Sequence, residues 1–354
     1  MKRNALIAVV ACVAVAAAAC GSSGGKPAAG KPPAKTVVLM TYDSYAVSKS
    51  VLAAFTHETG FKVKVLRTGD AGQLVSTAIE IRDHPVGDAL FGIDNTYLAW
   101  GLVANVFAPF TAKGLSTVPK QFQLDPTHRL TPVDSGEVCV NDDLAWFGRN
   151  GHPPAPTSLA DLAKPAYRKL LVVENPATSS PGLAFVLTTV AALGDHWQDY
   201  WKSLRANGVR IDDTWDAAYD TDFTAGGGKN GDRPLVVSYA TDPAADVVFS
   251  DGKKKTPTVG VVPGTCFAQV EFAGVLQGAK NPVGAQALVN FMLTRQYQEG
   301  IPLQNYVYPV VKGTKLPPVF LQFAQQPHAY SMDANAIGAS RNTWLEQWTK
   351  IVLQ

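Results

Sequence analysis

Aromatic, carboxylate and hydroxyl side chains follow several predicted strands, at the point where each strand ends. They are Tyr42, Asp43, Asp94, Asn95, Thr178, Ser179, Ser180 and Tyr239. In an open α/β sheet, ligands bind at the carboxyl ends of the strands. We therefore expect these side chains to contribute to one ligand-binding site.

A simpler reading exists for most of these positions, because Asp43, Asp94, Asn95 and Ser180 are also good helix N-caps. Capping explains the tyrosines less well. It also leaves out Trp215 and Tyr219, which lie four residues apart and would share one helix face, either toward a ligand or in a core. Asp70, in the sequence Gly69–Gly72, contributes to the site or simply makes a turn.

These residue types together describe one kind of ligand. Tyr and Trp rings attract flat rings and delocalised cations. A carboxylate such as Asp43 or Asp94 suits an aminopyrimidine edge or a positive charge. The hydroxyls of 178–180, placed before a helix, suit an alcohol or a phosphate. A planar cationic heterocycle with a polar tail would use all three.

The elements that must position these residues alternate between strand and helix. We predict strands at Thr36–Tyr42, Phe61–Arg67, Ala89–Asp94, Leu171–Pro176 and Pro234–Ala240, with helices at Val47–Glu58, Gly72–Arg82, Asn95–Val103, and from Pro181 and Asp242. This alternation is typical of βαβ units on a mostly parallel sheet. The fold class is therefore α/β, with two sheet-based lobes: residues 36–138 and 265–354 form lobe 1, and 139–264 form lobe 2. Two crossings between the lobes, at Leu130–Asn141 and Gly264–Leu276, would make a hinge beside a ligand cleft.

The N-terminus predicts export. Lys2 and Arg3 precede an apolar run and then Cys20, so residues 1–20 are typical of a signal peptide. The stretch Ala17–Gly21 resembles a lipobox, which predicts lipidation of Cys20 and a flexible tether over 21–35. The alternative, cleavage of the signal peptide without lipidation of Cys20, stays open. Export also permits a disulfide between Cys139 and Cys266, with two buried thiols as the alternative.

Charge and motifs exclude several classes of protein. The chain has 354 residues with 31 basic and 29 acidic side chains, but five basic ones precede the first acidic residue, so 26 against 29 remain beyond them. This small negative balance argues against nucleic acid as a partner. The six histidines have no metal-ligand spacing, and no hydrolase elbow, P-loop or C-x-x-C is present. We expect no enzyme, no cofactor and no metal.

Several segments, in order along the chain, carry a family resemblance. They are Thr41–Ser44, Gly92–Asn95, Thr178–Leu183, Thr214–Tyr219, Val237–Ala244, Gln269–Val275 and Ile301–Val310. On these the chain resembles the thiamine-binding periplasmic proteins of bacterial ABC importers, which have the type II periplasmic binding-protein fold. The resemblance implies capture of thiamine, or a thiamine phosphate, for delivery to an ABC transporter permease. We expect a monomer held to the membrane through its lipid only.

The resemblance also implies that Tyr42, Asp43, Ser179, Trp215 and Tyr239 lie in or beside the cleft. One position departs from the family. Ala245 stands where a tyrosine often stacks on the pyrimidine, so another aromatic supplies that stack or the ligand preference differs.

Two other functions stay open. One is a receptor of the same fold for another solute: ferric iron, with Tyr306 and Tyr308 as ligands, or a polyamine, which would need several carboxylates among the aromatics. The other is an exported enzyme acting on thiamine-like heterocycles. It would need Cys139 or Cys266 as its nucleophile, and a disulfide between them would eliminate it.

Overall fold

A computed structural model describes residues 35–228 and 230–354 of the chain. The predicted signal peptide, the predicted tether and Cys20 lie outside this part. The described residues form one unit. Within the described residues, no helix has the length and hydrophobicity that a bilayer-crossing segment needs.

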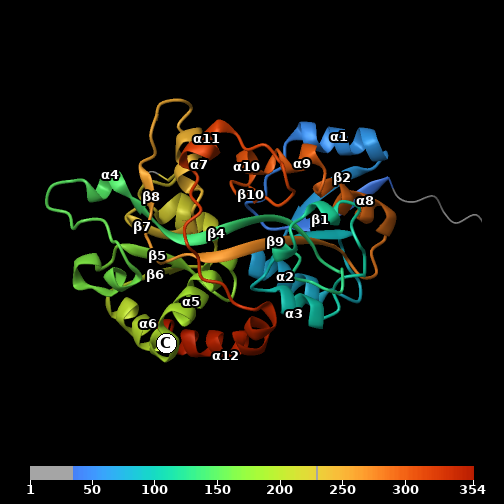
Figure 1. Ribbon diagram of the computed structural model, residues 1–354. Helices are drawn as coiled ribbons and strands as arrows, with labels where there is room; N and C mark the ends of the chain where they lie inside the picture. The colour runs from blue at the N-terminus through green and yellow to red at the C-terminus, as the bar shows by residue number, and fades with distance from the viewer. Residues whose placement is uncertain (1–34, 229) are drawn as a thin grey trace, which may run out of the picture. The chain divides into compact units, whose positions relative to one another are not determined.

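One mixed sheet runs through the unit (Figure 1). Its strand order is β2 (Lys62–Arg67), β1 (Thr36–Thr41), β3 (Ala89–Asp94), β9 (Phe267–Val275), β4 (Thr131–Asp143), β7 (Leu235–Tyr239), β5 (Leu171–Glu174) and β6 (Arg210–Asp212). The group β2-β1-β3 is parallel, and so is the group β7-β5-β6. These two parallel groups are the sheets of the two predicted halves.

The antiparallel strands β4 and β9 join the two parallel groups. They are the two predicted crossings, and their side chains are nearly all buried. Near the start of β4 the register shifts between Pro132 and Asp134, where proline cannot donate to the ladder. Two short strands, β8 (Val259–Val261) and β10 (Tyr308–Pro309), also pair with β4.

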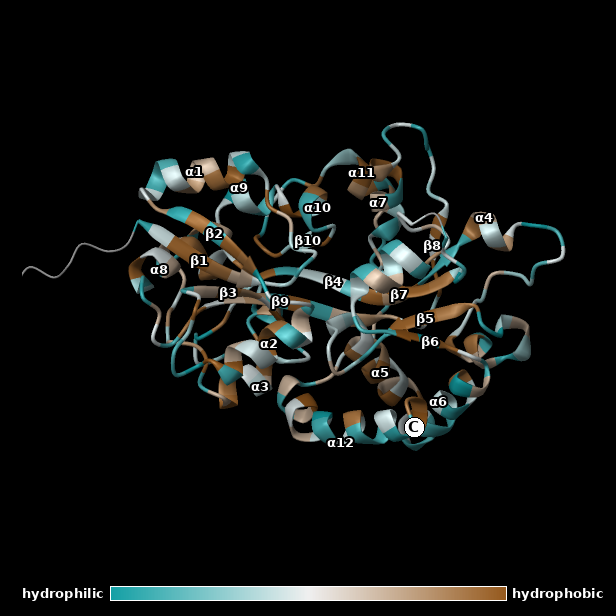
Figure 2. Ribbon diagram, turned by 180° about the vertical axis from the view of Figure 1, so that it is seen from behind, coloured by the Kyte–Doolittle hydropathy of each residue, from teal (hydrophilic) through white to brown (hydrophobic). Residues whose placement is uncertain are grey.

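Helices cover both faces of the sheet, as βαβ connections require (Figures 1 and 2). The longer ones before the second crossing are α1 (Lys49–Thr59), α2 (Ala71–Glu80), α3 (Leu98–Val103), α5 (Ser180–Leu193), α6 (Trp197–Ala206) and α7 (Asp242–Phe249). Asp70 begins α2 with a capping box that includes Gln73. Ser179 precedes α5, whose first turn holds Pro181 as the sequence predicts.

The C-terminal third returns to both halves. It holds α8 (Pro282–Met292), α9 (Arg295–Gln298), α10 (Ile301–Gln304), α11 (Pro318–Phe323) and α12 (Ala334–Val352). Helix α11 packs on α7, and α12 packs on both α6 and α3. On α12, Trp348 meets Trp201 edge-on at 5.5 Å between ring centroids. The lobe boundaries of the sequence analysis stay a prediction, because residues beyond 317 contact elements of both predicted lobes.

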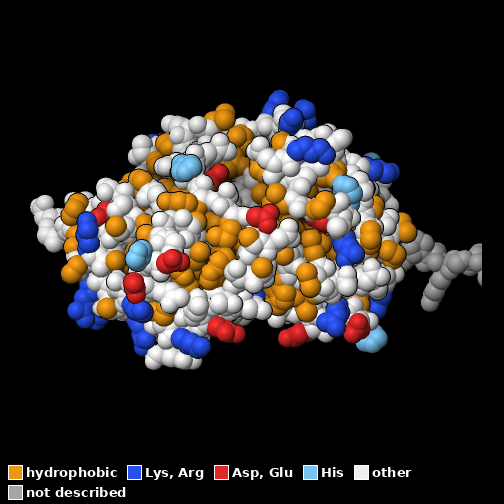
Figure 3. Space-filling view, turned by 60° about the horizontal axis from the view of Figure 1, so that its bottom comes forward, with side chains coloured by type: hydrophobic (Ala, Val, Ile, Leu, Met, Phe, Trp, Pro, Cys, Tyr) orange, Lys and Arg blue, Asp and Glu red, His pale blue; other side chains and the backbone are white. Residues whose placement is uncertain are grey.

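The remaining elements are short. They are α4 (Leu144–Phe147), the 3₁₀ turns η1 (Leu115–Thr117), η2 (Lys120–Phe122), η3 (Leu159–Ala163), η4 (Pro165–Tyr167) and η5 (Gly194–His196), and the π-helical turn η6 (Ala217–Asp222). On the face seen in Figure 3, Lys and Arg side chains are scattered among hydrophobic and acidic ones and form no continuous basic band.

Candidate ligand-binding site

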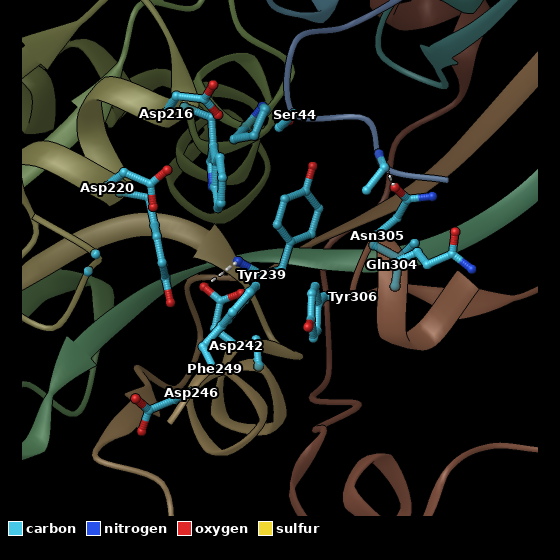
Figure 4. A pocket seen from close by; sticks show the side chains of 18 of the residues that line it. Ser44, Asp216, Asp220, Tyr239, Asp242, Asp246, Phe249, Gln304, Asn305 and Tyr306 are labelled. Atoms are coloured by element: carbon cyan, nitrogen blue, oxygen red, sulfur yellow. Dashed lines mark hydrogen bonds between the residues drawn. The ribbon is translucent and has the colours of Figure 1, made fainter. Parts of the chain in front are cut away.

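A cavity of about 850 Å³ lies where the strand ends of both parallel groups meet. This volume is within the range of small-molecule pockets. Six of the predicted site residues line it: Tyr42, Asp70, Ser180, Trp215, Tyr219 and Tyr239. In Figure 4, Tyr239 and Tyr306 lie between a wall that carries Asp216 and Asp220 and an opposite wall that carries Gln304 and Asn305.

Two stacked rings form one side of the cavity. The rings of Trp215 and Tyr219 lie 4.8 Å apart between centroids with an angle of 14° between their planes. Trp215 lies just before the π-helical turn η6 and Tyr219 lies within it. π-Helical turns often occur at functional sites. The indole N–H of Trp215 donates to Ser238 Oγ at 3.0 Å, which fixes the orientation of the ring.

Asp70 connects two walls of the cavity. Its Oδ1 accepts from the N–H of Ala71 at 2.7 Å, and its Oδ2 accepts from the N–H of Trp215 at 3.0 Å. The first bond caps α2, and the second reaches the predicted lobe 2. Burial raises the pKa of Asp70, while the two backbone donors lower it. A second bond between the same regions runs from the N–H of Gly72 to the carbonyl of Thr178 at 2.8 Å.

Carboxyl groups dominate the charge of the lining. The described lining residues include six carboxyl groups and two lysines: Asp70, Asp216, Asp220, Asp242, Asp246 and Glu271, with Lys253 and Lys254. Lys254 is ion-paired with Asp246, which leaves an excess of carboxyl groups facing the cavity. Burial raises the pKa of Asp242 to about 7. Such a lining favours a cationic ligand.

A second aromatic pair lies at the edge of the cavity. Phe249 on α7 and Tyr306, after α10, have ring centroids 4.9 Å apart. Phe249 is 70% exposed, although it lines the cavity. It follows Ala245 by four residues and so lies on the same face of α7. An aromatic ring is thus available one helical turn beyond Ala245.

Asp94 and Asn95 do not line the cavity, because the protein itself satisfies their side chains. Asp94 accepts from the amide of Thr96 at 2.8 Å and from Gln269 Nε2 at 2.7 Å, and it also accepts from the hydroxyl of Ser180. Asn95 exchanges hydrogen bonds with the backbone of β9: its Nδ2 donates to the carbonyl of residue 268, and its Oδ1 accepts from the N–H of residue 270. Both residues hold β3 against β9.

Asp43, Thr178 and Ser179 also lie outside the lining. Asp43 is exposed, and its Oδ1 accepts from the N–H of Gly69 at 3.1 Å. Thr178 Oγ1 donates to the carbonyl of Asp213 at 2.7 Å. Ser179 is fully buried before α5. The polar cluster before α5 therefore presents only Ser180 to the cavity.

A sequence model of the family described as "Bacterial extracellular solute-binding protein" matches residues 102–325. The chain belongs to this family. The architecture described above suits a solute-binding protein, because a cavity with a polar and aromatic lining lies where the two parallel strand groups meet.

Several known proteins resemble this solute-binding protein along most of its length. The thiamine-binding periplasmic protein of Salmonella typhimurium is 26% identical over 331 residues, which is 92% of this chain and 95% of the relative. Iron uptake protein A1 of Synechocystis is 23% identical over 317 residues, or 84% and 82%. The solved structure titled "Periplasmic thiamin binding protein" superposes with a TM-score of 0.77 at 24% identity, covering 90% of this chain and 96% of that one. The predicted type II periplasmic binding-protein fold is confirmed.

Two of the open alternatives meet structural obstacles in this solute-binding protein. Cys139 and Cys266 form a disulfide, so neither is a free thiol that could act as a nucleophile. Tyr306 and Tyr308 do not face one metal site: only Tyr306 lines the cavity, and the hydroxyl of Tyr308 donates to the carbonyl of Gln325 at 3.3 Å. Among the described residues, no group of three His, Cys, Asp or Glu side chains is placed to hold a metal ion.

The sequence reasoning missed several lining residues of this solute-binding protein. Glu271 and Asp242 lie in segments that carry the family resemblance, and their acidic type was the available signal. Phe249 was missed because a phenylalanine at the end of an amphipathic helix predicts core packing. Gly226 and Gly227, which look like a surface turn in the sequence, line the cavity.

Proposed function

We propose that this solute-binding protein captures thiamine outside the cytoplasm and delivers it to an ABC importer. The observation that carries the proposal is the cavity lining, in which aromatic rings stand among an excess of carboxyl groups. Thiamine is a planar, permanently cationic ligand, and this lining suits such a ligand. The thiamine-binding name of the Salmonella relative, aligned over 92% of the chain, adds support.

In the proposed complex, a ligand ring lies on the face of Trp215 that Tyr219 does not cover. Phe249 and Tyr306 supply the second aromatic contact, in place of the side chain that Ala245 lacks. The carboxyl groups balance the positive charge. Ser180 and Lys253 lie along the lining where the hydroxyethyl group or its phosphates would be bound.

Five of the predicted site residues have a supporting role in this proposal. Asp94 orients Ser180, and Asn95 holds β3 against β9. Thr178 and Ser179 fix the turn before α5. Asp43 orders the loop at Gly69, next to Asp70.

Binding is proposed to shift an equilibrium between open and closed arrangements of the two halves, with the closed form recognised by the permease. Two contacts described above would be made on closure. The Asp70–Trp215 hydrogen bond and the Phe249–Tyr306 pair each join residue segments 139–264 to the rest of the unit. A ligand between these groups would favour the closed form.

Isothermal titration calorimetry of the full chain tests the function. We expect binding of one thiamine per chain, with thiamine mono- and diphosphate as further ligands. Ferric citrate and spermidine are the comparison ligands, because an iron uptake protein is among the relatives and a lining rich in carboxyl groups also suits a polyamine. Binding of spermidine or iron with no heat from thiamine would overturn the proposal.

The proposed location is the outer face of the membrane, reached by export and held by a lipid on Cys20, with the protein as a monomer. Support comes from the basic, apolar and small-residue pattern of 1–20. Substitution of Cys20→Ala tests the anchor. The variant is expected in the soluble extracytoplasmic fraction, whereas the unaltered chain stays with membranes. Equal membrane association of both would reject lipidation.

A further inference from the structure

Two carboxyl groups lie side by side on the strands that join the halves. Asp134 on β4 and Glu271 on β9 are direct cross-strand partners. Opposed residues of an antiparallel pair have Cβ atoms about 5 Å apart and share one face of the sheet. Asp134 is fully buried, Glu271 is 4% exposed, and Glu271 lines the cavity. Glu271 thus faces the cavity, and Asp134 lies beside it, away from the lining.

Little in the protein stabilises negative charge on this pair. Apart from Glu271 itself, no described residue offers a hydrogen-bond donor to either carboxyl oxygen of Asp134. Glu271 accepts from the hydroxyl of Tyr42 at 3.2 Å. No ion pair of the described part of the chain includes either carboxyl group. A buried carboxylate without a cation or donors is costly, and two adjacent ones cannot both ionise readily.

The other titratable groups around the pair do not supply a cation. They are Asp94 on β3, Tyr42 and Tyr45 beyond β1, Tyr239 on β7 and Tyr297 on α9. Asp94 adds further negative charge near Glu271. Burial raises the pKa of Asp134 to about 8. Burial, and then the charge of Asp134, raise the pKa of Glu271 well above its ordinary value.

We propose that Asp134 and Glu271 hold a proton in the ligand-free protein, and that a cationic ligand displaces this proton when its positive charge comes to lie beside Glu271. This inference rests on the proposed function for the identity of the ligand. The proton leaves the carboxyl pair for solvent, and the cation balances the second carboxylate that its departure creates. The net charge at the cavity floor is then the same in both states.

This exchange links affinity to pH. Since the proton and the cation compete for the pair, affinity falls as the pH falls below the range in which the pair releases its proton. The dissociation constant rises by up to tenfold for each pH unit while one full proton is released on binding. Without such exchange, the affinity for a permanently charged ligand is nearly independent of pH in this range.

Calorimetry with thiamine in two buffers of different ionisation enthalpy measures the protons released. For the unaltered protein near pH 7 we expect a release of up to one proton per thiamine bound. Glu271→Gln should abolish the release and weaken binding. Asp134→Asn should reduce the release, because Glu271 then ionises more readily before the ligand arrives. Equal heats in both buffers for the unaltered protein would overturn the inference.

Glu137→Gln is the matched control. Glu137 lies on the same strand, burial raises its pKa to about 7, and it does not line the cavity. This variant should release the same number of protons as the unaltered protein. If it loses the release as Glu271→Gln does, the proton comes from general burial on β4 and the inference is wrong.

A measurement without ligand separates this inference from the proposed function. The infrared difference spectrum at pH 7 between the ligand-free unaltered protein and a variant with both Asp134→Asn and Glu271→Gln should show the carbonyl band of a protonated carboxyl group. A missing band overturns the inference whatever the ligand. No thiamine heat with the band present overturns the proposed function alone. Circular dichroism and thermal melting confirm that each variant is folded.

Discussion

The stacked tryptophan offers the sharpest test of the proposed ligand contacts. Trp215 is half-buried, with one ring face against Tyr219 and its N–H bonded to Ser238 Oγ. Substitution of Trp215→Ala removes the ring on which the ligand is proposed to stack. It leaves Tyr219 in place as a more distant aromatic.

The size of the effect follows from the lost contacts. A well-placed aromatic pair contributes about 0.5–1.5 kcal/mol, and a cation over a partly desolvated ring contributes about 0.5–2 kcal/mol. A loss of about 1–3 kcal/mol weakens thiamine binding roughly 5- to 150-fold. Trp215→Phe keeps a ring and loses only the hydrogen bond to Ser238, so its cost is about 1 kcal/mol, or roughly fivefold.

Titration calorimetry and tryptophan fluorescence measure these effects together. The unaltered protein should show quenching by thiamine that disappears in Trp215→Ala. Trp146→Ala is the control, because Trp146 on α4 packs against His152 at 3.8 Å between centroids and does not line the cavity. Unchanged affinity in Trp215→Ala, or an equal loss in Trp146→Ala, would refute the reasoning.

Three further substitutions test other parts of the site. Asp70→Ala should lower the free energy of unfolding in urea by about 1 kcal/mol, because the cap of α2 is lost. It should also weaken thiamine binding roughly tenfold, because the bond to Trp215 is lost. Unchanged thiamine affinity would show that this bond plays no part in closure. Phe249→Ala should change the free energy of unfolding by less than about 0.5 kcal/mol, since the side chain is 70% exposed. It should nevertheless weaken thiamine binding about three- to tenfold in calorimetry. The control is Leu321→Ala, because Leu321 is 72% exposed and lies outside the cavity; this variant should leave both stability and thiamine binding unchanged. Replacing both Cys139 and Cys266 by serine removes a disulfide between residues that are 127 positions apart in the sequence. The free energy of unfolding in denaturant should fall by about 4 kcal/mol. An unchanged free energy of unfolding would contradict a stabilising role for the disulfide.

Much of the fold could be predicted because periodicity and connection length are local signals. The alternation of strands and helices gave both parallel groups, and the extended segments at 130–141 and 264–276 correspond to β4 and β9. The joining of all these strands into one sheet could not be predicted. It depends on long-range pairing of β4 with β9 and β7, which no local pattern encodes.

The candidate site was predicted only in part, for a similar reason. A strand end marks the neighbourhood of a ligand, but not the direction of each side chain. Asp94 was expected in the site from its type, yet neighbouring donors from Thr96 and Gln269 satisfy it inside the protein. Phe249 was not expected, because its exposure depends on where α7 ends relative to Tyr306. The hydrogen-bond partners of a buried polar group depend on the folded structure. They decide which of several similar residues remain available to a ligand.

A crystal structure of the full chain with thiamine would show directly whether the cavity holds this ligand. We expect thiamine in the 850 Å³ cavity, with a ring against the free face of Trp215 and its positive charge beside Glu271. Thiamine bound elsewhere on the molecule, or bound in the cavity with its charged ring away from both residues, would contradict it.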